Sequence, residues 1–182
     1  HVVHIRALLE TAVKNADILG VPTLEQQGRN GLHLLMSEIV EWLEPRGAIA
    51  NCSLHRNLQE DGYMRQLLTS VDRVGLVTCR KVSDKLNNRY HTKTTTWLVP
   101  AEANTDGEPS NKHYPDRFDE IMAGVGLEHQ GLWFVGAGPL GKIYCDRLRE
   151  RGSVAVDIGS VFDGWAGIVS RSYLRDREVY KL

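Results

Sequence analysis

The chain has 182 residues, of which 42% are hydrophobic and 25% are charged, as in soluble globular proteins. Its 22 basic and 23 acidic side chains give a net charge of −1, which removes the electrostatic argument for a nucleic-acid or membrane partner. No apolar run approaches the roughly 20 residues that span a bilayer, and no signal peptide is visible. Cys52, Cys79 and Cys145 are odd in number and far apart, which favours reduced core thiols and a cytoplasmic location.

Hydrophobic periodicity predicts helices that alternate with short apolar segments along the chain. We expect helices over residues 2–15, 30–44, 61–71 and 140–151, with shorter ones near 83 and after 115. Residues 16–22 form a short apolar segment, and strands are expected at 48–53, 74–79, 94–99, 132–135 and 154–158. Such strands without polar alternation predict an α/β fold, Rossmann-like, with a mostly parallel sheet and helices on both faces. Residues 1–182 are expected to be one domain, truncated at its N-terminus because His1 already lies in an ordered pattern.

A glycine-rich turn follows the strand at 132–135. It reads Gly136-Ala137-Gly138-Pro139-Leu140-Gly141, and Asp157 comes sixteen residues later at the end of the next strand. In a βαβ unit this turn exposes backbone N–H groups at a helix N-terminus, where they attract phosphate. Gly136 would allow the tight turn, Gly138 the approach of an anion and Gly141 close helix packing, while Asp157 would bind a ribose hydroxyl. The alternative is that the glycines are purely structural.

Polar residues after other strands are further candidates. His55 and Arg56 follow the strand at 48–53, so His55 could be a general base and Arg56 a phosphate clamp at the carboxyl edge of the sheet. The alternative is a pair of exposed loop residues. Candidate substrate contacts are also Asn51, Glu102, Asp163 and Trp165. For Asn51, Glu102 and Trp165 the alternatives are a backbone hydrogen bond, an ordinary loop acid and core packing, respectively.

Residues 135–165 (VGAGPLGKIYCDRLRERGSVAVDIGSVFDGW) resemble the C-terminal segment of bacterial GT-D-type glycosyltransferases. In that family a glycine turn, a helix and a strand ending in D-I-G follow one another. Upstream, ADILGVP (16–22) resembles the family's A-D-x-I-G-V/I segment, NCSLHR (51–56) falls where it has a strand ending in a polar segment, and WLVPAE (97–102) resembles its V-P-A-E stretch. The family's usual histidine after D-I-G is replaced by Ser160.

The resemblance implies a metal-dependent transfer of a hexose from a UDP-sugar to a glycan or glycoconjugate acceptor. It places the Mn²⁺ or Mg²⁺ ligands in a D-x-E motif after the first strand, expected upstream of His1, so residues 1–182 alone are expected to be inactive. The D-x-E matches at 106–108 and 176–178 are interpreted as chance surface acids. The predicted catalytic residues are His55 and Asp157. The predicted nucleotide-binding residues are Gly136, Ala137, Gly138, Gly141, Asp157 and Gly159.

Two other functions fit the same residues. The turn and Asp157 would suit the adenosine ribose of NAD(P) or S-adenosylmethionine in a Rossmann enzyme equally well. The chain could also be a non-catalytic module that keeps a sugar-nucleotide fold. Stabilisation by UDP with Mn²⁺, compared with NAD(H) and S-adenosylmethionine, discriminates among these functions.

Overall fold

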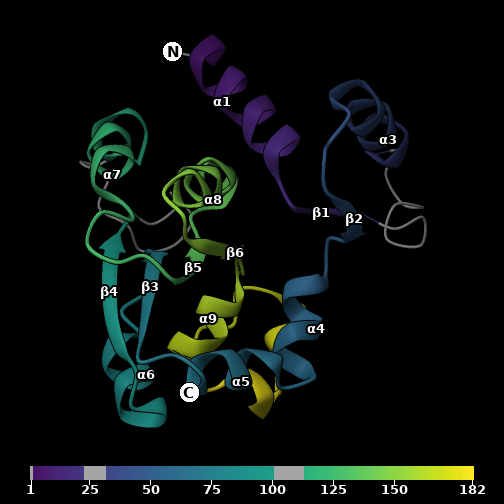
Figure 1. Ribbon diagram of the computed structural model, residues 1–182. Helices are drawn as coiled ribbons and strands as arrows, with labels where there is room; N and C mark the ends of the chain where they lie inside the picture. Colours follow the sequence, from purple (N-terminus) through teal and green to yellow (C-terminus); the bar gives the residue numbers. More distant parts are fainter. Residues whose placement is uncertain (1, 23–31, 101–112) are drawn as a thin grey trace.

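The computed structural model describes residues 2–22, 32–100 and 113–182 (Figure 1). Its helices are α1 (Val2–Asn15), α3 (Leu32–Leu43), α4 (Leu54–Glu60), α5 (Tyr63–Thr69), α6 (Ser83–Tyr90), α7 (Phe118–Gly124), α8 (Gly141–Glu150) and α9 (Val161–Ala166). Its strands are β1 (Ile18–Val21), β2 (Ala48–Asn51), β3 (Arg73–Thr78), β4 (Lys93–Leu98), β5 (Leu132–Gly136) and β6 (Val154–Asp157). The predicted alternation of helices and strands is therefore confirmed.

Every strand pair of the described residues is parallel. Four strands form a sheet in the order β4-β3-β5-β6, and β1 and β2 pair only with each other. The sequence predicts a single sheet, and the structure corrects this to two. Ile18 of β1 and Ile49 of β2 are 58% and 51% exposed, so this short pair is not a central part of a sheet covered on both faces.

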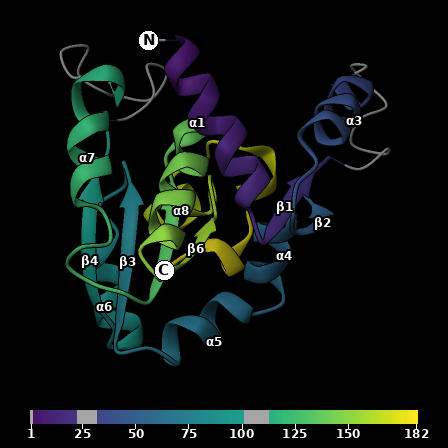
Figure 2. The same ribbon diagram turned by 45° about the horizontal axis from the view of Figure 1, so that its top comes forward.

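The larger sheet lies between two layers of helices, as predicted. Figures 1 and 2 show α1, α7 and α8 on one face, and α1 packs along α8. Helices α5, α6 and α9 cover the other face (Figure 1). The central strands β3 and β5 are almost wholly buried. Gly75 of β3 is paired in register with Trp133 of β5, and a Cβ at Gly75 would lie 2.0 Å from the indole, so the missing side chain makes room for this ring.

The strand order identifies the edge at which a ligand would bind. From β3 the chain passes to β4 on one side and then returns to β5 on the other side of β3. The order thus reverses between β3 and β5. In open parallel sheets, ligands bind outside the carboxyl ends of the strands at such a reversal. The glycine turn follows β5, so the fold places it at this edge.

Two helices were not predicted. Residues 54–60, which include His55 and Arg56, form α4 rather than an irregular loop, and Gly62 with φ +79° separates α4 from α5. Residues 161–166, which follow D-I-G after Ser160, form α9. No helix in the described part of the chain is long and apolar enough to cross a membrane.

Candidate functional site

The glycines of the turn between β5 and α8 have different structural roles. Gly138 has φ +59° and opens a short 3₁₀ turn, Gly138–Leu140, so it supplies the left-handed residue that glycine best tolerates. A Cβ at Gly136 would lie 2.5 Å from the Phe162 ring and 2.9 Å from the Gly159 carbonyl oxygen. The tight turn therefore depends on Gly138, and Gly136 allows close packing, which corrects the turn role predicted for Gly136. The approach of an anion at Gly138 stays a prediction.

Gly141 has the packing role that the sequence predicts. A Cβ at this position would lie 3.3 Å from Asp157 Oδ2 and 3.3 Å from Val135 Cγ1. The first residue of α8 is thus pressed against β5 and the end of β6. Ala137, between the first two glycines, is 6% exposed. Its side chain is part of the protein interior, so any contact that it makes with a nucleotide would come from its backbone.

Asp157 ends β6 beside the start of α8. Its Oδ2 accepts a hydrogen bond from Lys142 Nζ at 2.6 Å, and its Oδ1 accepts one from the Gly159 N–H at 3.0 Å. Gly159 has φ +47°, so the carboxylate also stabilises a turn that favours glycine. The structure therefore brings the glycine turn and Asp157 together. Each carboxylate oxygen keeps lone-pair capacity for a further donor.

His55, in the first turn of α4, contributes an imidazole to the same region. The charges of Asp157, Arg56 and Lys142 all act on it. Its pKa is lowered from the ordinary value chiefly by burial, while a bond to the Cys52 carbonyl and the charge of Asp157 oppose the shift. Nδ1 lies 3.0 Å from the Cys52 carbonyl oxygen. Since a carbonyl only accepts, Nδ1 carries the proton and Nε2 keeps a free lone pair at neutral pH.

Arg56 is partly buried next to His55. Its guanidinium carbon lies 4.9 Å from the centroid of the Tyr173 ring. Nε of Arg56 is buried and has no hydrogen-bond partner among the described residues. His55 and Arg56 are thus not the exposed loop pair of the alternative interpretation, because both belong to a helix that packs against α9 and the C-terminal segment.

A model of the GT-D fold-like domain matches residues 2–165, most of the chain. The chain belongs to this family. No curated protein and no solved structure matches it. The resemblance inferred from residues 135–165 is therefore confirmed at the level of the family. The match also covers α1 and the β1–β2 pair, so these elements are part of the GT-D fold-like domain.

Trp165 of the GT-D fold-like domain does not stack on a substrate. The side chain is 1% exposed and packs edge-to-face on Phe134 and Phe162. Its Nε1 donates a hydrogen bond to Gln59 Oε1 at 3.1 Å. A buried indole needs such a partner for its N–H. The predicted substrate contact is wrong, and the core alternative is correct.

Other predicted contacts are engaged within the protein or lie outside the described residues. Asp163 Oδ1 accepts a hydrogen bond from Arg80 Nε at 2.6 Å, and Oδ2 accepts one from the Ser170 hydroxyl. This carboxylate ties α9 to the end of β3, and its geometry gives no support to a substrate contact. Asn51 Oδ1 accepts the Ser53 N–H at 2.8 Å, which is the backbone role of the alternative. Glu102 lies outside the described residues.

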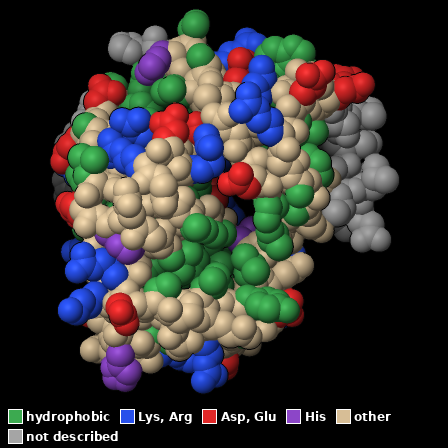
Figure 3. Space-filling model, viewed as in Figure 1, with side chains coloured by type: hydrophobic (Ala, Val, Ile, Leu, Met, Phe, Trp, Pro, Cys, Tyr) green, Lys and Arg blue, Asp and Glu red, His purple; other side chains and the backbone are tan. Residues whose placement is uncertain are grey.

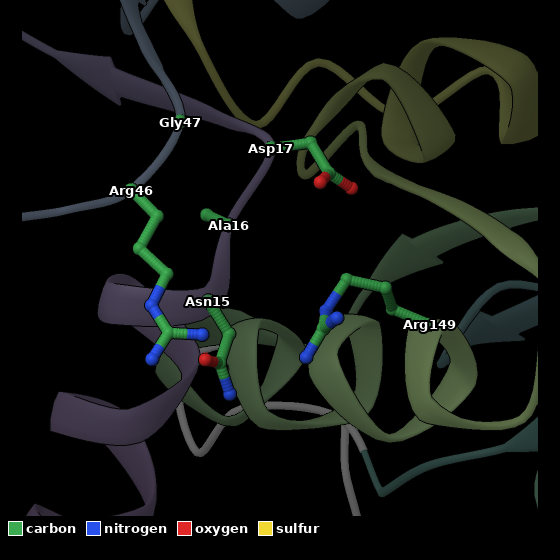
Figure 4. Close-up of a pocket in the computed structure, with 6 residues that line it drawn as sticks. All are labelled: Asn15, Ala16, Asp17, Arg46, Gly47 and Arg149. Carbon is green, nitrogen blue, oxygen red and sulfur yellow. The ribbon is translucent and has the colours of Figure 1, made fainter.

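The surface of the domain has two hollows, one at each of two different places. Figure 3 shows one near the centre of its face, with charged side chains on one side and apolar ones on the other; β6, α4 and β2 surround this position in Figure 1. A polar pocket of about 290 Å³ lies instead at the amino ends of β1 and β2, lined by Asn15, Ala16, Asp17, Arg46, Gly47 and Arg149 (Figure 4). Arg149 is already paired with Asp146 at 2.9 Å. We place the candidate site at the carboxyl edge, because the topology and the His55–Asp157 group coincide there.

Lys142 and Tyr173 were not predicted from the sequence. Lys142 directly follows the last glycine of the motif, and a cation at this position could have indicated an anion-binding residue. Tyr173 had no signal, because its contact with Arg56 joins residues that are far apart in the sequence. In the described part of the chain no three His, Cys, Asp or Glu side chains cluster as metal ligands. The metal that the resemblance implies, with ligands expected upstream of His1, stays a prediction.

Proposed function

We propose that this GT-D fold-like domain transfers a hexose from a UDP-sugar to a glycan or glycoconjugate acceptor. The observation that carries the proposal is the group at the carboxyl edge: the glycine turn, Asp157 and a neutral His55 held beside two cationic side chains. Family membership supports the transferase fold. The donor and the acceptor follow from the resemblance to GT-D-type glycosyltransferases, and the role of each residue is inferred from its chemistry.

In this reaction the acceptor oxygen attacks C1 of the sugar while the bond from C1 to the diphosphate oxygen breaks. The acceptor proton goes to a base, and UDP leaves with the bonding electrons. His55 suits the base because its unprotonated Nε2 can receive that proton. The backbone N–H groups of Gly138 and Leu140 would face the leaving diphosphate, since Pro139 has none and the Gly141 N–H donates to the Gly138 carbonyl. Asp157 would accept a hydrogen bond from a hydroxyl of the ribose or sugar.

Ligand-induced thermal stabilisation tests the nucleotide. We expect UDP, tested with and without Mn²⁺, to raise the melting temperature. At a ligand concentration 100 times Kd the gain in unfolding free energy is about 2.7 kcal/mol, or roughly 5–10 °C for a chain of this size. NAD(H) and S-adenosylmethionine should have no effect. Stabilisation by either of these, with none by UDP, would establish the Rossmann alternative in its place.

Catalysis needs its own experiment. Incubation of the full-length protein, with any residues upstream of His1, with radiolabelled UDP-glucose and candidate glycans should release UDP in step with label transferred to the acceptor, whereas residues 1–182 alone are expected to be inactive. A full-length protein that binds UDP but shows neither transfer nor slow hydrolysis of the donor, with and without added Mn²⁺, would be a binding module. That outcome would leave the nucleotide site standing and remove the transferase activity.

A further inference from the structure

Two cationic side chains from different elements flank His55. Arg56 comes from α4 and Lys142 from the first turn of α8, and the charge of each lowers the pKa of the imidazole. The Lys142 side chain is 51% exposed. Its ammonium donates to Asp157 and has two further N–H donors. Lys142 can therefore bind an anion without breaking its ion pair.

Arg56 has a donor that the fold does not use. Nε is buried, and the described residues provide no acceptor for it. A buried donor without a partner costs free energy, about 1–3 kcal/mol, so it is an unusual feature for a purely structural arginine. The guanidinium stacks on the Tyr173 ring. Stacking on an aromatic face leaves the edge of an arginine available for an oxyanion.

Tyr173 lies beyond residue 165, where the family match ends. Its hydroxyl is 2.6 Å from Ser160 Oγ, directly after the D-I-G turn, and its ring packs on Tyr180 at 5.3 Å. The same C-terminal segment is anchored on α4, since Arg177 pairs with Glu60 at 2.7 Å and the Tyr180 hydroxyl donates to the same carboxylate. This segment therefore fixes Arg56 relative to the turn that follows β6.

We propose that Arg56 and Lys142 form a subsite for a diphosphate group, and that Tyr173 is a positioning residue that holds Arg56 in it. This inference rests on the proposed function, because it assigns the leaving diphosphate of the nucleotide sugar to these two cations. Two positive charges would stabilise the negative charge that develops on the leaving diphosphate. Residues outside the matched domain thereby complete the site.

Calorimetric titration with inorganic pyrophosphate, UDP and uridine tests the subsite. Arg56→Gln and Lys142→Gln should each weaken pyrophosphate and UDP binding roughly ten- to hundredfold, the range for loss of a charge-assisted hydrogen bond. Uridine has no phosphate, so its affinity should not change. A purely structural role for Arg56 would instead lower the melting temperature and leave pyrophosphate affinity as it was. Arg56→Lys, which keeps the charge but loses the buried Nε, serves if Arg56→Gln does not fold.

Tyr173 is tested by a matched pair. Tyr173→Phe keeps the ring and loses only the hydroxyl contact with Ser160, so pyrophosphate affinity should stay within about twofold of the wild type. Tyr173→Leu removes the ring and should weaken pyrophosphate binding roughly three- to tenfold, the equivalent of an exposed cation–π contact. Equal affinities for Tyr173→Leu and the wild type would show that Tyr173 does not position Arg56.

The arginines of the polar pocket at the amino edge are the control. Arg46→Gln and Arg149→Gln should leave pyrophosphate binding unchanged, and loss of binding in either would move the anion site to that pocket and overturn the proposal. If Arg56→Gln and Lys142→Gln bind UDP and transfer sugar as well as the wild type does, the subsite is refuted and the proposed function stands. Pyrophosphate binding that depends on both cations, without binding of UDP, would support the subsite and refute the proposed function.

Discussion

At the scale of single residues, the protonation state of His55 determines whether it can act as the base. Burial lowers its pKa from the ordinary value, so the imidazole is neutral at pH 7 and loses its lone pair only at lower pH. We expect kcat/KM to stay level as pH falls from 8 towards 6.5 and to decline below the lowered pKa. His55→Asn should reduce kcat by about 10²- to 10⁴-fold. A pH–rate profile of the full-length wild type and variant measures both effects, and an unchanged profile in His55→Asn would rule out this base.

Gly136 offers a second residue-scale test, on stability. In Gly136→Ala the new Cβ would lie 2.5 Å from the Phe162 ring and 2.9 Å from the Gly159 carbonyl oxygen. Such overpacking costs about 1–3 kcal/mol of unfolding free energy, measured by urea denaturation. Adding Phe162→Leu should cost less in this variant than in the wild type, because the ring is one of the two obstacles. Strict additivity of the two substitutions would show that the ring is not an obstacle.

At the scale of elements, the sequence predicted the helices and strands that have a clear apolar pattern. The apolar runs at 74–79 and 132–135 are central strands because nearly every residue in them is buried. Helix α4 was missed because LHRNLQE has only two apolar residues, Leu54 and Leu58, which is too short a pattern to indicate a helix. The separation of β1–β2 from the main sheet depends on strand pairing, which a local pattern does not contain. The part of the site formed by neighbouring motif residues was predictable. The contact between Arg56 and Tyr173 was not, because these residues are far apart in the sequence.

Helix α9 anchors the core below the candidate site through Trp165. Trp165→Ala should lower the unfolding free energy by about 3–5 kcal/mol, the usual cost of removing a large buried side chain. Trp42 of α3 is 60% exposed, so Trp42→Ala is the matched control and should cost less than about 1 kcal/mol. Chemical denaturation compares the two. Similar small losses for both tryptophans would contradict the core position of Trp165.

At the scale of the whole molecule, the stability of the domain should depend on pH through His113. This residue precedes α7 and joins it to α8, since Nε2 lies 2.8 Å from the Tyr144 hydroxyl and the two rings stack at 5.6 Å. Tyr144 is fully buried in the cluster that α1, α7 and α8 form on the sheet. Burial lowers the pKa of His113 to about 4. The folded protein therefore holds this imidazole neutral, in a place where a charge is unfavourable.

The sign of the effect follows from the difference between the two states. In the unfolded chain His113 takes up a proton near its ordinary pKa of 6.5, whereas in the folded protein it does so only near 4. Between these values the unfolded state binds more protons, so the unfolding free energy should fall as pH decreases from about 6.5 towards 4. The limiting slope for one group is about 1.4 kcal/mol per pH unit, and the partial exposure of His113 makes the expected slope smaller. His113→Gln should flatten the curve measured by urea denaturation across this range. His4→Gln, at an exposed position of α1, should keep the wild-type slope, and identical slopes in wild type and His113→Gln would show that other groups govern the acid sensitivity.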